Sequence, residues 1–130
     1  AATRAASLED LTASSVQRLR WMAREGATTV EIKSGYGLSL GQELKQLEAA
    51  RLAGEQAGVR VKRTFLALHA LPPEFREDRA AYVQLVADVM IPAVAAAGAA
   101  DAVDAYCDTI GFTSEECDYV FSAARRAGLA

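Results

Sequence analysis

Three short stretches of this chain contain residue types that can do chemistry, and each follows an apolar run. The first is "KSGYGL" with Lys33 and Tyr36, the second is "LHALPPEF" with His69, and the third is "YCDTIGF" with Cys107 and Asp108. A tyrosine joins an apolar ring to a hydroxyl, and an imidazole offers a hydrogen-bond donor and an acceptor. These groups favour contact with a small polar ligand.

The glycines around Tyr36 allow two interpretations. Gly35, Gly37 and Gly41 lie between a strand pattern and a helix pattern, as in a dinucleotide fingerprint, but that motif requires its third glycine at Leu40. The acid that binds ribose is also missing from the end of the next strand, and the chain has no P-loop lysine motif. We therefore favour the second interpretation, a backbone elbow that directs Tyr36 towards a ligand other than a nucleotide.

The remaining candidates carry weaker signals. His69 is the only histidine, and a lone histidine in an apolar strand is more often a core residue. Its place before two prolines, which stiffen the following loop, favours a site instead. Lys33 could form a Schiff base or, when carboxylated, bridge two metals, but without nearby histidines we expect it to meet solvent or a carboxylate. Asp108 is placed to face a site, whereas Asp101 belongs at the start of the third strand.

A repeated order of helix, glycine and strand organises the chain. Helix patterns cover 7–26, 39–58, 78–98 and 113–128, and each ends at a glycine. Ser7 with Asp10, Ser39 with Gln42, and Thr113 with Glu116 predict the helix starts. Pro92 lies inside the third helix and should kink or interrupt it. Strand patterns cover 27–34, 59–70 and 101–108.

Strands that alternate with amphipathic helices predict an α/β fold with a parallel sheet. Three strands alternating with four helices fit either a doubly wound sheet or part of a β/α barrel, and both bind ligands at the carboxyl ends of the strands. The chain opens on a helix and stops where a strand is expected. We therefore expect residues 1–130 to be one segment of a larger domain, truncated at both ends.

The bulk composition excludes several classes of protein. A net charge of −3 and an isoelectric point near 5.2 give no reason to expect nucleic acid or an anionic membrane as a partner. No run approaches the length of a membrane span, and the start lacks a signal-peptide pattern. Two cysteines without metal-type spacing indicate reduced thiols in a cytosolic protein.

Three segments, taken in order and spacing, carry a family resemblance. They are "TTVEIKSGYGLSL..ELK", "FLALHALPPEF" and "ADAVDAYCDTIGFTSEE". Together they resemble the imidazolonepropionases of the amidohydrolase superfamily, over essentially all 130 residues. The resemblance implies a partial (β/α)8 TIM-like barrel. It also implies a cytoplasmic parent enzyme of histidine degradation that hydrolyses 4-imidazolone-5-propanoate to N-formimino-L-glutamate.

The same resemblance implies the site residues. Tyr36 and His69 match family residues that contact the substrate, whereas the family's catalytic and metal-binding residues find no match in this chain. The parent is expected to hold one iron or zinc ion, which lowers the pKa of a bound water. We expect no metal to bind this segment. We also expect the parent to be a homodimer, and the isolated segment to be inactive and to self-associate through its uncovered edges.

Two other interpretations stay open at this point. The parent could be a related amidohydrolase that acts on another cyclic amide or amidine. The chain could also be a non-catalytic β/α module that binds a ligand.

Overall fold

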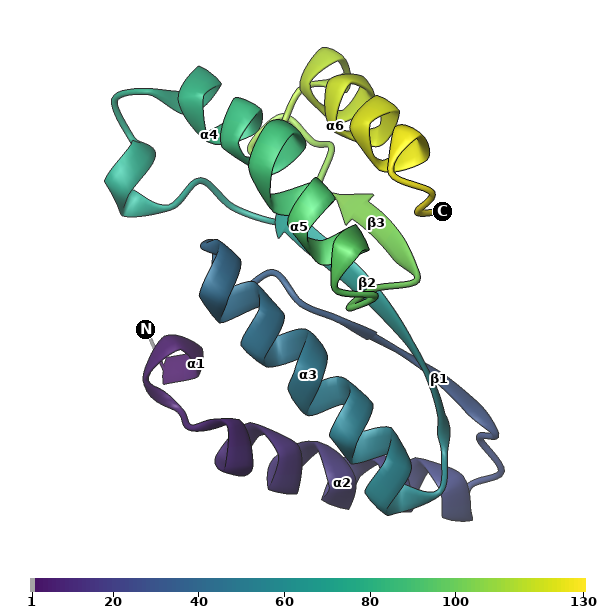
Figure 1. The fold of residues 1–130 in the computed structure, drawn as a ribbon. Coiled ribbons are helices and arrows are strands. Elements are labelled where there is room, and N and C mark those ends of the chain that lie inside the picture. The colour runs from purple at the N-terminus through teal and green to yellow at the C-terminus, as the bar shows by residue number, and fades with distance from the viewer. Residues whose placement is uncertain (1) are drawn as a thin grey trace.

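The structure, a computed structural model, describes residues 2–130 as a three-stranded parallel sheet with its helices (Figure 1). The strands are β1 (Thr29–Lys33), β2 (Arg60–Leu68) and β3 (Ala102–Ala105), and they pair in the order β1-β2-β3. Consecutive strands that pair in parallel need a crossover between them, and helices supply it. This arrangement confirms the α/β class and matches the predicted partial β/α barrel.

All four predicted helices are present, and the third is divided into three parts. They are α2 (Leu8–Arg24), α3 (Leu40–Ala57), the run α4 (Arg79–Leu85), η2 (Val86–Met90) and α5 (Ile91–Ala96), and α6 (Ser114–Arg126). The sequence patterns did not predict two short elements, α1 (Ala2–Ala5) and η1 (Pro73–Phe75). Figure 1 shows α2 and α3 side by side, and these two helices are in extensive contact.

All three predicted N-cap residues begin their helices, and two of the three form the predicted capping box. Ser7 and Thr113 each form a complete capping box with the acidic residue three positions later. Ser39 occupies the N-cap of α3, but its side chain makes no capping bond, so the predicted pairing with Gln42 is wrong. The buried carboxylate of Glu43 binds backbone amides that precede the helix instead. The four glycines that follow the helices all have positive φ, as predicted.

Pro92 has a visible effect on the third helix. The turn before it, Val86–Met90, is a wider π turn, and Pro92 lies in the first turn of α5. Proline lacks an N–H group and its ring would collide with a carbonyl one turn earlier, so a wider turn relieves the conflict. Pro92 therefore interrupts the regular α-helical geometry with a π segment, as predicted, but it does not end the helix.

The same helix corrects one sequence prediction. Residues 79–96 form a helix of 18 residues with a mean hydropathy of 1.3, which is long and apolar enough to span a membrane. The statement that no run approaches such a length is therefore wrong on length. Tyr82, Val86, Met90 and Ile91 from this helix are fully buried in the core of the domain. These four residues belong to the core, and 39% of the 18-residue helix is buried.

The two faces of the sheet differ in chemistry. Val30 and Ile32 of β1 pack with α2 and α3, and Phe65 of β2 packs with the helices that follow it. Because side chains alternate along a strand, Glu31 and Lys33 lie on the opposite, half-exposed face. The helices thus cover one face, and polar side chains occupy the other.

Candidate functional site

Tyr36 and His69 lie in contact at the carboxyl ends of two neighbouring parallel strands. Tyr36 follows β1 by three residues, and His69 follows β2 directly. Their ring centroids are 4.8 Å apart in an edge-to-face arrangement with an interplanar angle of 68°. The Tyr36 side chain remains well exposed, at 59% for the residue, and its hydroxyl makes no hydrogen bond within residues 2–130. The phenol is therefore free to contact a ligand.

A backbone hydrogen bond fixes the imidazole of His69. Nδ1 lies 2.8 Å from the carbonyl oxygen of Gly35. Because a carbonyl only accepts, Nδ1 must donate, and the hydrogen-bond network thus assigns the tautomer. In the neutral ring Nε2 is then a bare acceptor, and it has no partner in the described part of the chain. His69 is half-buried, between the core and ligand positions that the sequence left open.

The elbow before Tyr36 depends on two glycines. Gly35 has φ +107°, and a Cβ atom there would lie 2.6 Å from the carbonyl oxygen of Leu66 on β2. A Cβ atom at Gly37 would lie 2.5 Å from Cβ of Gln42. Both distances are too short for a real contact, so only glycine lets the loop approach β2 and α3 this closely. The glycine elbow is therefore present, whereas the contact of Tyr36 with a ligand stays a prediction.

Glu43 is the first residue of the site that sequence reasoning missed. Its side chain is fully buried, and its two oxygens accept hydrogen bonds from the amides of Gly35, Gly37 and Leu38 at 2.7–2.8 Å. The available signal was an acid in the first turn of a helix directly after a Gly-Tyr-Gly loop. The stronger pattern of Ser39 and Gln42 hid it.

Arg4 is the second missed residue. Its guanidinium donates through Nε to the carbonyl of Gly37 at 2.6 Å and through Nη1 to Glu74 at 2.6 Å. The hydrogen bond from Arg4 is the main reason that the pKa of Glu74 lies below its usual value. Arg4 therefore joins the loop after β1 to the loop after β2. Gly37 and Glu74 lie 33 and 70 positions after Arg4, and no sequence signal connects residues so far apart.

Lys33 lies on the open face of the sheet and pairs with carboxylates, as predicted. Nζ is 2.5 Å from Asp104 of β3 and 3.7 Å from Glu31. The hydrogen bond to Asp104 raises the pKa of Lys33, and burial opposes this only in part. Burial alone would raise the pKa of Asp104, but the hydrogen bonds from Lys33 and from the amide of Ala105 lower it.

Asp108 lies in the turn after β3, and that it faces the site stays a prediction. Its carboxylate is exposed and accepts a hydrogen bond from its neighbour Thr109 within the turn that follows β3. Asp104, four residues earlier, is the aspartate that reaches across the sheet. Asp101 lies just before β3 and pairs with Lys62, as expected for the start of the strand. The strand is shorter than predicted, and its pairing with β2 contains a register shift, so Asp108 falls beyond the sheet.

The two cysteines are free thiols in different environments. Cys107 is exposed and Cys117 is buried on α6. Burial, together with the neighbouring Cys107 thiol, raises the pKa of Cys117 to about 11. The buried thiol is thus a poor nucleophile at neutral pH.

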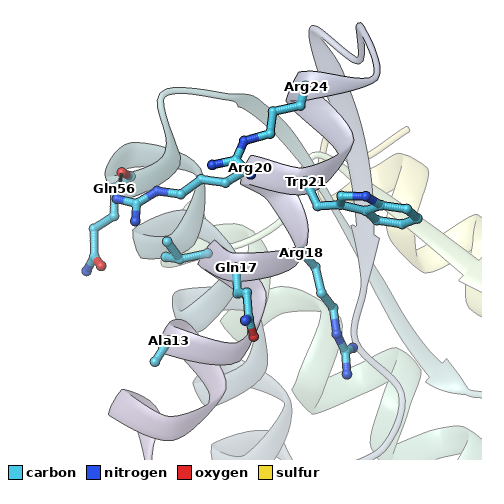
Figure 2. A pocket seen from close by; sticks show the side chains of 8 residues that line it. Ala13, Gln17, Arg18, Arg20, Trp21, Arg24 and Gln56 are labelled. Atoms are coloured by element: carbon cyan, nitrogen blue, oxygen red, sulfur yellow. Dashed lines mark hydrogen bonds between the residues drawn. The ribbon is translucent and has the colours of Figure 1, made fainter.

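A large hollow lies away from Tyr36 and His69. It measures about 860 Å³ and is lined by residues of α2 and the end of α3, including Arg18, Arg20, Trp21, Arg24 and Gln56. Figure 2 shows Arg20 directed towards Gln56 and Trp21 directed away from it. Arg20 donates to the carbonyl of Gln56 at 3.2 Å, as basic residues often do at helix ends. We therefore assign this hollow to helix-end packing.

The described residues do not fit a metal centre. Within residues 2–130, no three His, Cys, Asp or Glu side chains lie close enough together to hold an ion. His69 alone could supply one ligand through Nε2.

The fold and the site together define a class. A parallel β/α segment carries the side chains of Tyr36 and His69 at the carboxyl ends of neighbouring strands. This is where β/α enzymes bind their substrates.

Comparison with known proteins gives a more specific relationship. The chain is 56% identical over 128 residues to an imidazolonepropionase of Caulobacter vibrioides, which covers 98% of this chain and 32% of the relative. It is 55% identical over 129 residues to that of Hyphomonas neptunium, and 52% over 128 residues to that of Aeromonas salmonicida. No protein-family model matches the chain. The chain spans about a third of the length of these relatives. The resemblance to imidazolonepropionases is confirmed over nearly all of this chain.

Proposed function

We propose that the native protein that carries this chain is an imidazolonepropionase. It would hydrolyse the ring of 4-imidazolone-5-propanoate to N-formimino-L-glutamate, a step of histidine degradation. The observation that carries this proposal is the contact between Tyr36 and His69 at one rim of the sheet, in a chain more than half identical to proteins of that name. Residues 1–130 would form one segment of its amidohydrolase barrel.

In this proposal Tyr36 and His69 bind the substrate. The Tyr36 ring can lie against the planar imidazolone, and its hydroxyl can donate a hydrogen bond to the carbonyl oxygen or to a ring nitrogen. His69 donates through Nδ1 to Gly35, so Nε2 can accept a hydrogen bond from a ring N–H of the substrate. Both contacts orient the ring for attack by water at its carbonyl carbon.

The iron or zinc ion implied by the family would be bound by residues outside this chain. When bound, such an ion supplies a hydroxide at neutral pH. The part of this chain that the structure describes contributes substrate contacts and the backbone that positions them. The isolated segment should therefore not hydrolyse the substrate, and turnover by the purified segment that resists chelators would overturn this expectation.

The function is tested by loss of imidazolone absorbance with the native protein and its variants. We expect Tyr36→Phe and His69→Ala each to lower kcat/KM by about tenfold or more, because each removes a hydrogen bond to the substrate. Tyr119→Phe is the matched control, since Tyr119 lies on α6 and bonds Asp88 on the surface. Unchanged kinetics in both site variants would refute these roles. Faster turnover of another cyclic amide or amidine would favour the related-hydrolase alternative.

We also propose a cytoplasmic location and a homodimer for the native protein, which rest on the family resemblance. For the isolated segment we expect self-association instead. β1 and β3 each have an edge without a partner strand within residues 2–130, and such edges pair readily with other chains. Size-exclusion chromatography with light scattering tests both expectations. A compact monomer that unfolds cooperatively would contradict the prediction for the segment.

A further inference from the structure

The loop of residues 35–38 directs its amides at one buried anion. The amides of Gly35, Gly37 and Leu38 donate to the carboxylate of Glu43 at 2.7, 2.8 and 2.7 Å. Converging backbone amides of this kind form a nest, which in other proteins binds phosphate or another anion. Here the anion belongs to the chain itself, because Glu43 is fully buried and occupies the centre of the nest.

The rest of the loop backbone is held as well. The amide of Tyr36 lies 3.4 Å from Oε1 of Gln46, one turn further along α3. On the carbonyl side, His69 binds Gly35 and Arg4 binds Gly37. The backbone of the elbow is therefore fixed from several directions, while the side chain of Tyr36 alone points outward.

The conformation of the loop shows why an anion is needed. Leu38 has φ +58°, a left-handed conformation that is rare for residues other than glycine. Gly35 is left-handed as well, at φ +107°. These two conformations turn the amides inward, and without an acceptor the amides would be buried and unpaired.

We propose that Glu43 is the residue that positions Tyr36 in the substrate site. This inference rests on the proposed role of Tyr36. The carboxylate acts as the permanent anion of the nest and sets the direction in which the phenol leaves the backbone. Glu43 touches neither substrate nor reacting atoms, so its effect must pass through Tyr36.

Chemical rescue in the native protein tests this proposal. Glu43→Ala leaves a space into which three amides point, and formate has the size and charge to fill it. We expect kcat/KM to fall between about tenfold and a hundredfold, and added formate to restore at least about threefold. Chloride at equal ionic strength should restore nothing. Glu48→Ala on the exposed side of α3 is the matched control and should respond to neither salt.

A second readout separates positioning from general loss of structure. In a Tyr36→Phe background, Glu43→Ala should lower kcat/KM by less than it does alone, since the two changes act on one contact. Full additivity would overturn the proposal, and so would a folded Glu43→Ala protein with wild-type kinetics. If Glu43→Ala is unfolded, refolding on addition of formate supports the proposal, and Glu43→Gln provides the folded variant for kinetics.

The outcome can be read even if the proposed activity fails. 3-Fluorotyrosine placed at position 36 reports the surroundings of the phenol by its 19F shift, without any substrate. The shift should move in Glu43→Ala and return with formate. An inactive wild-type protein would refute the proposed function, whereas an unmoved 19F signal would refute the role of Glu43.

Discussion

The two ends of the sheet differ in how firmly their polar groups are held. At the carboxyl end, Glu43 and Arg4 bind the loop that carries Tyr36, and this loop contains two residues with positive φ. At the opposite end, the hollow of Figure 2 is lined by arginines and by Trp21, which is 64% exposed. Only one hydrogen bond, from Arg20 to the carbonyl of Gln56, links side chains that line the hollow to the described backbone there.

This difference indicates which end is built for a ligand. A site that must hold a ring in one orientation needs groups whose positions are fixed before binding. The Tyr36 loop meets this condition because the buried carboxylate of Glu43 holds its amides, and the partly buried side chains of Arg4 and His69 hold its carbonyls. The arginines on α2 can adopt many rotamers, so the hollow lacks a comparably fixed set of groups.

The comparison is tested most strongly at Gly35. We expect Gly35→Ala to lower the unfolding free energy of the native protein by roughly 2–3 kcal/mol, because a methyl group would collide with the Leu66 carbonyl at a left-handed position. Gly41→Ala is the matched control. A Cβ atom at Gly41 meets nothing within 4 Å, so in this helix the change should stabilise by about 0.5–1 kcal/mol. Denaturant unfolding measures both, and equal effects would break the comparison.

A smaller effect is expected from acid at the carboxyl end. Arg79 holds the loop after β3 by binding both Glu116 and the carbonyl of Gly111. The hydrogen bond from Arg79 is the main cause that lowers the pKa of Glu116 from its ordinary value of 4.5. The stabilisation is therefore present above pH 4.5 and is lost as the pH falls through the lowered pKa.

Unfolding of the native protein from pH 7 to pH 3 checks this. We expect wild type to lose about 1 kcal/mol more than Glu116→Gln over this range, since the pair is partly exposed to solvent. Parallel curves for the two proteins would show that the pair does not stabilise the loop.

The smallest effect is expected at the opposite end. Arg20→Ala removes one exposed hydrogen bond to a helix-end carbonyl, so the unfolding free energy should change by less than about 0.5 kcal/mol. Thermal unfolding of the native protein would detect a larger loss of unfolding free energy. A loss of 2 kcal/mol or more would show that the hollow is as firmly organised as the Tyr36 loop, and the contrast drawn above would disappear.

Sequence patterns predicted the parts of the structure that depend on local physics. The left-handed glycines, two of the three capping boxes and the parallel order all follow from short-range periodicity and helix-end chemistry. The contact between Tyr36 and His69 follows from a simple rule, because neighbouring parallel strands bring their carboxyl ends to one rim.

The parts that could not be predicted depend on distant contacts. Ser39 with Gln42 formed the stronger local capping pattern, and only the loop geometry shows that Glu43 binds the backbone amides instead. Arg4 acts on residues far along the chain, and nothing near it in the sequence shows that. Asp104, and not Asp108, makes the cross-strand ion pair with Lys33, and the early end of β3 at Ala105 was not visible in the sequence pattern.

The hydrogen bonds of Arg4 give the short helix α1 a structural role that its sequence does not suggest. The guanidinium of Arg4 donates hydrogen bonds to two loops. The ammonium of Lys45 in turn donates to the backbone carbonyls of Arg4 and Ala6. Removing these few residues would break the link between the two loops, while Glu43 would still hold the first of them. Attempts to shorten or tag this segment should therefore leave its opening helix intact.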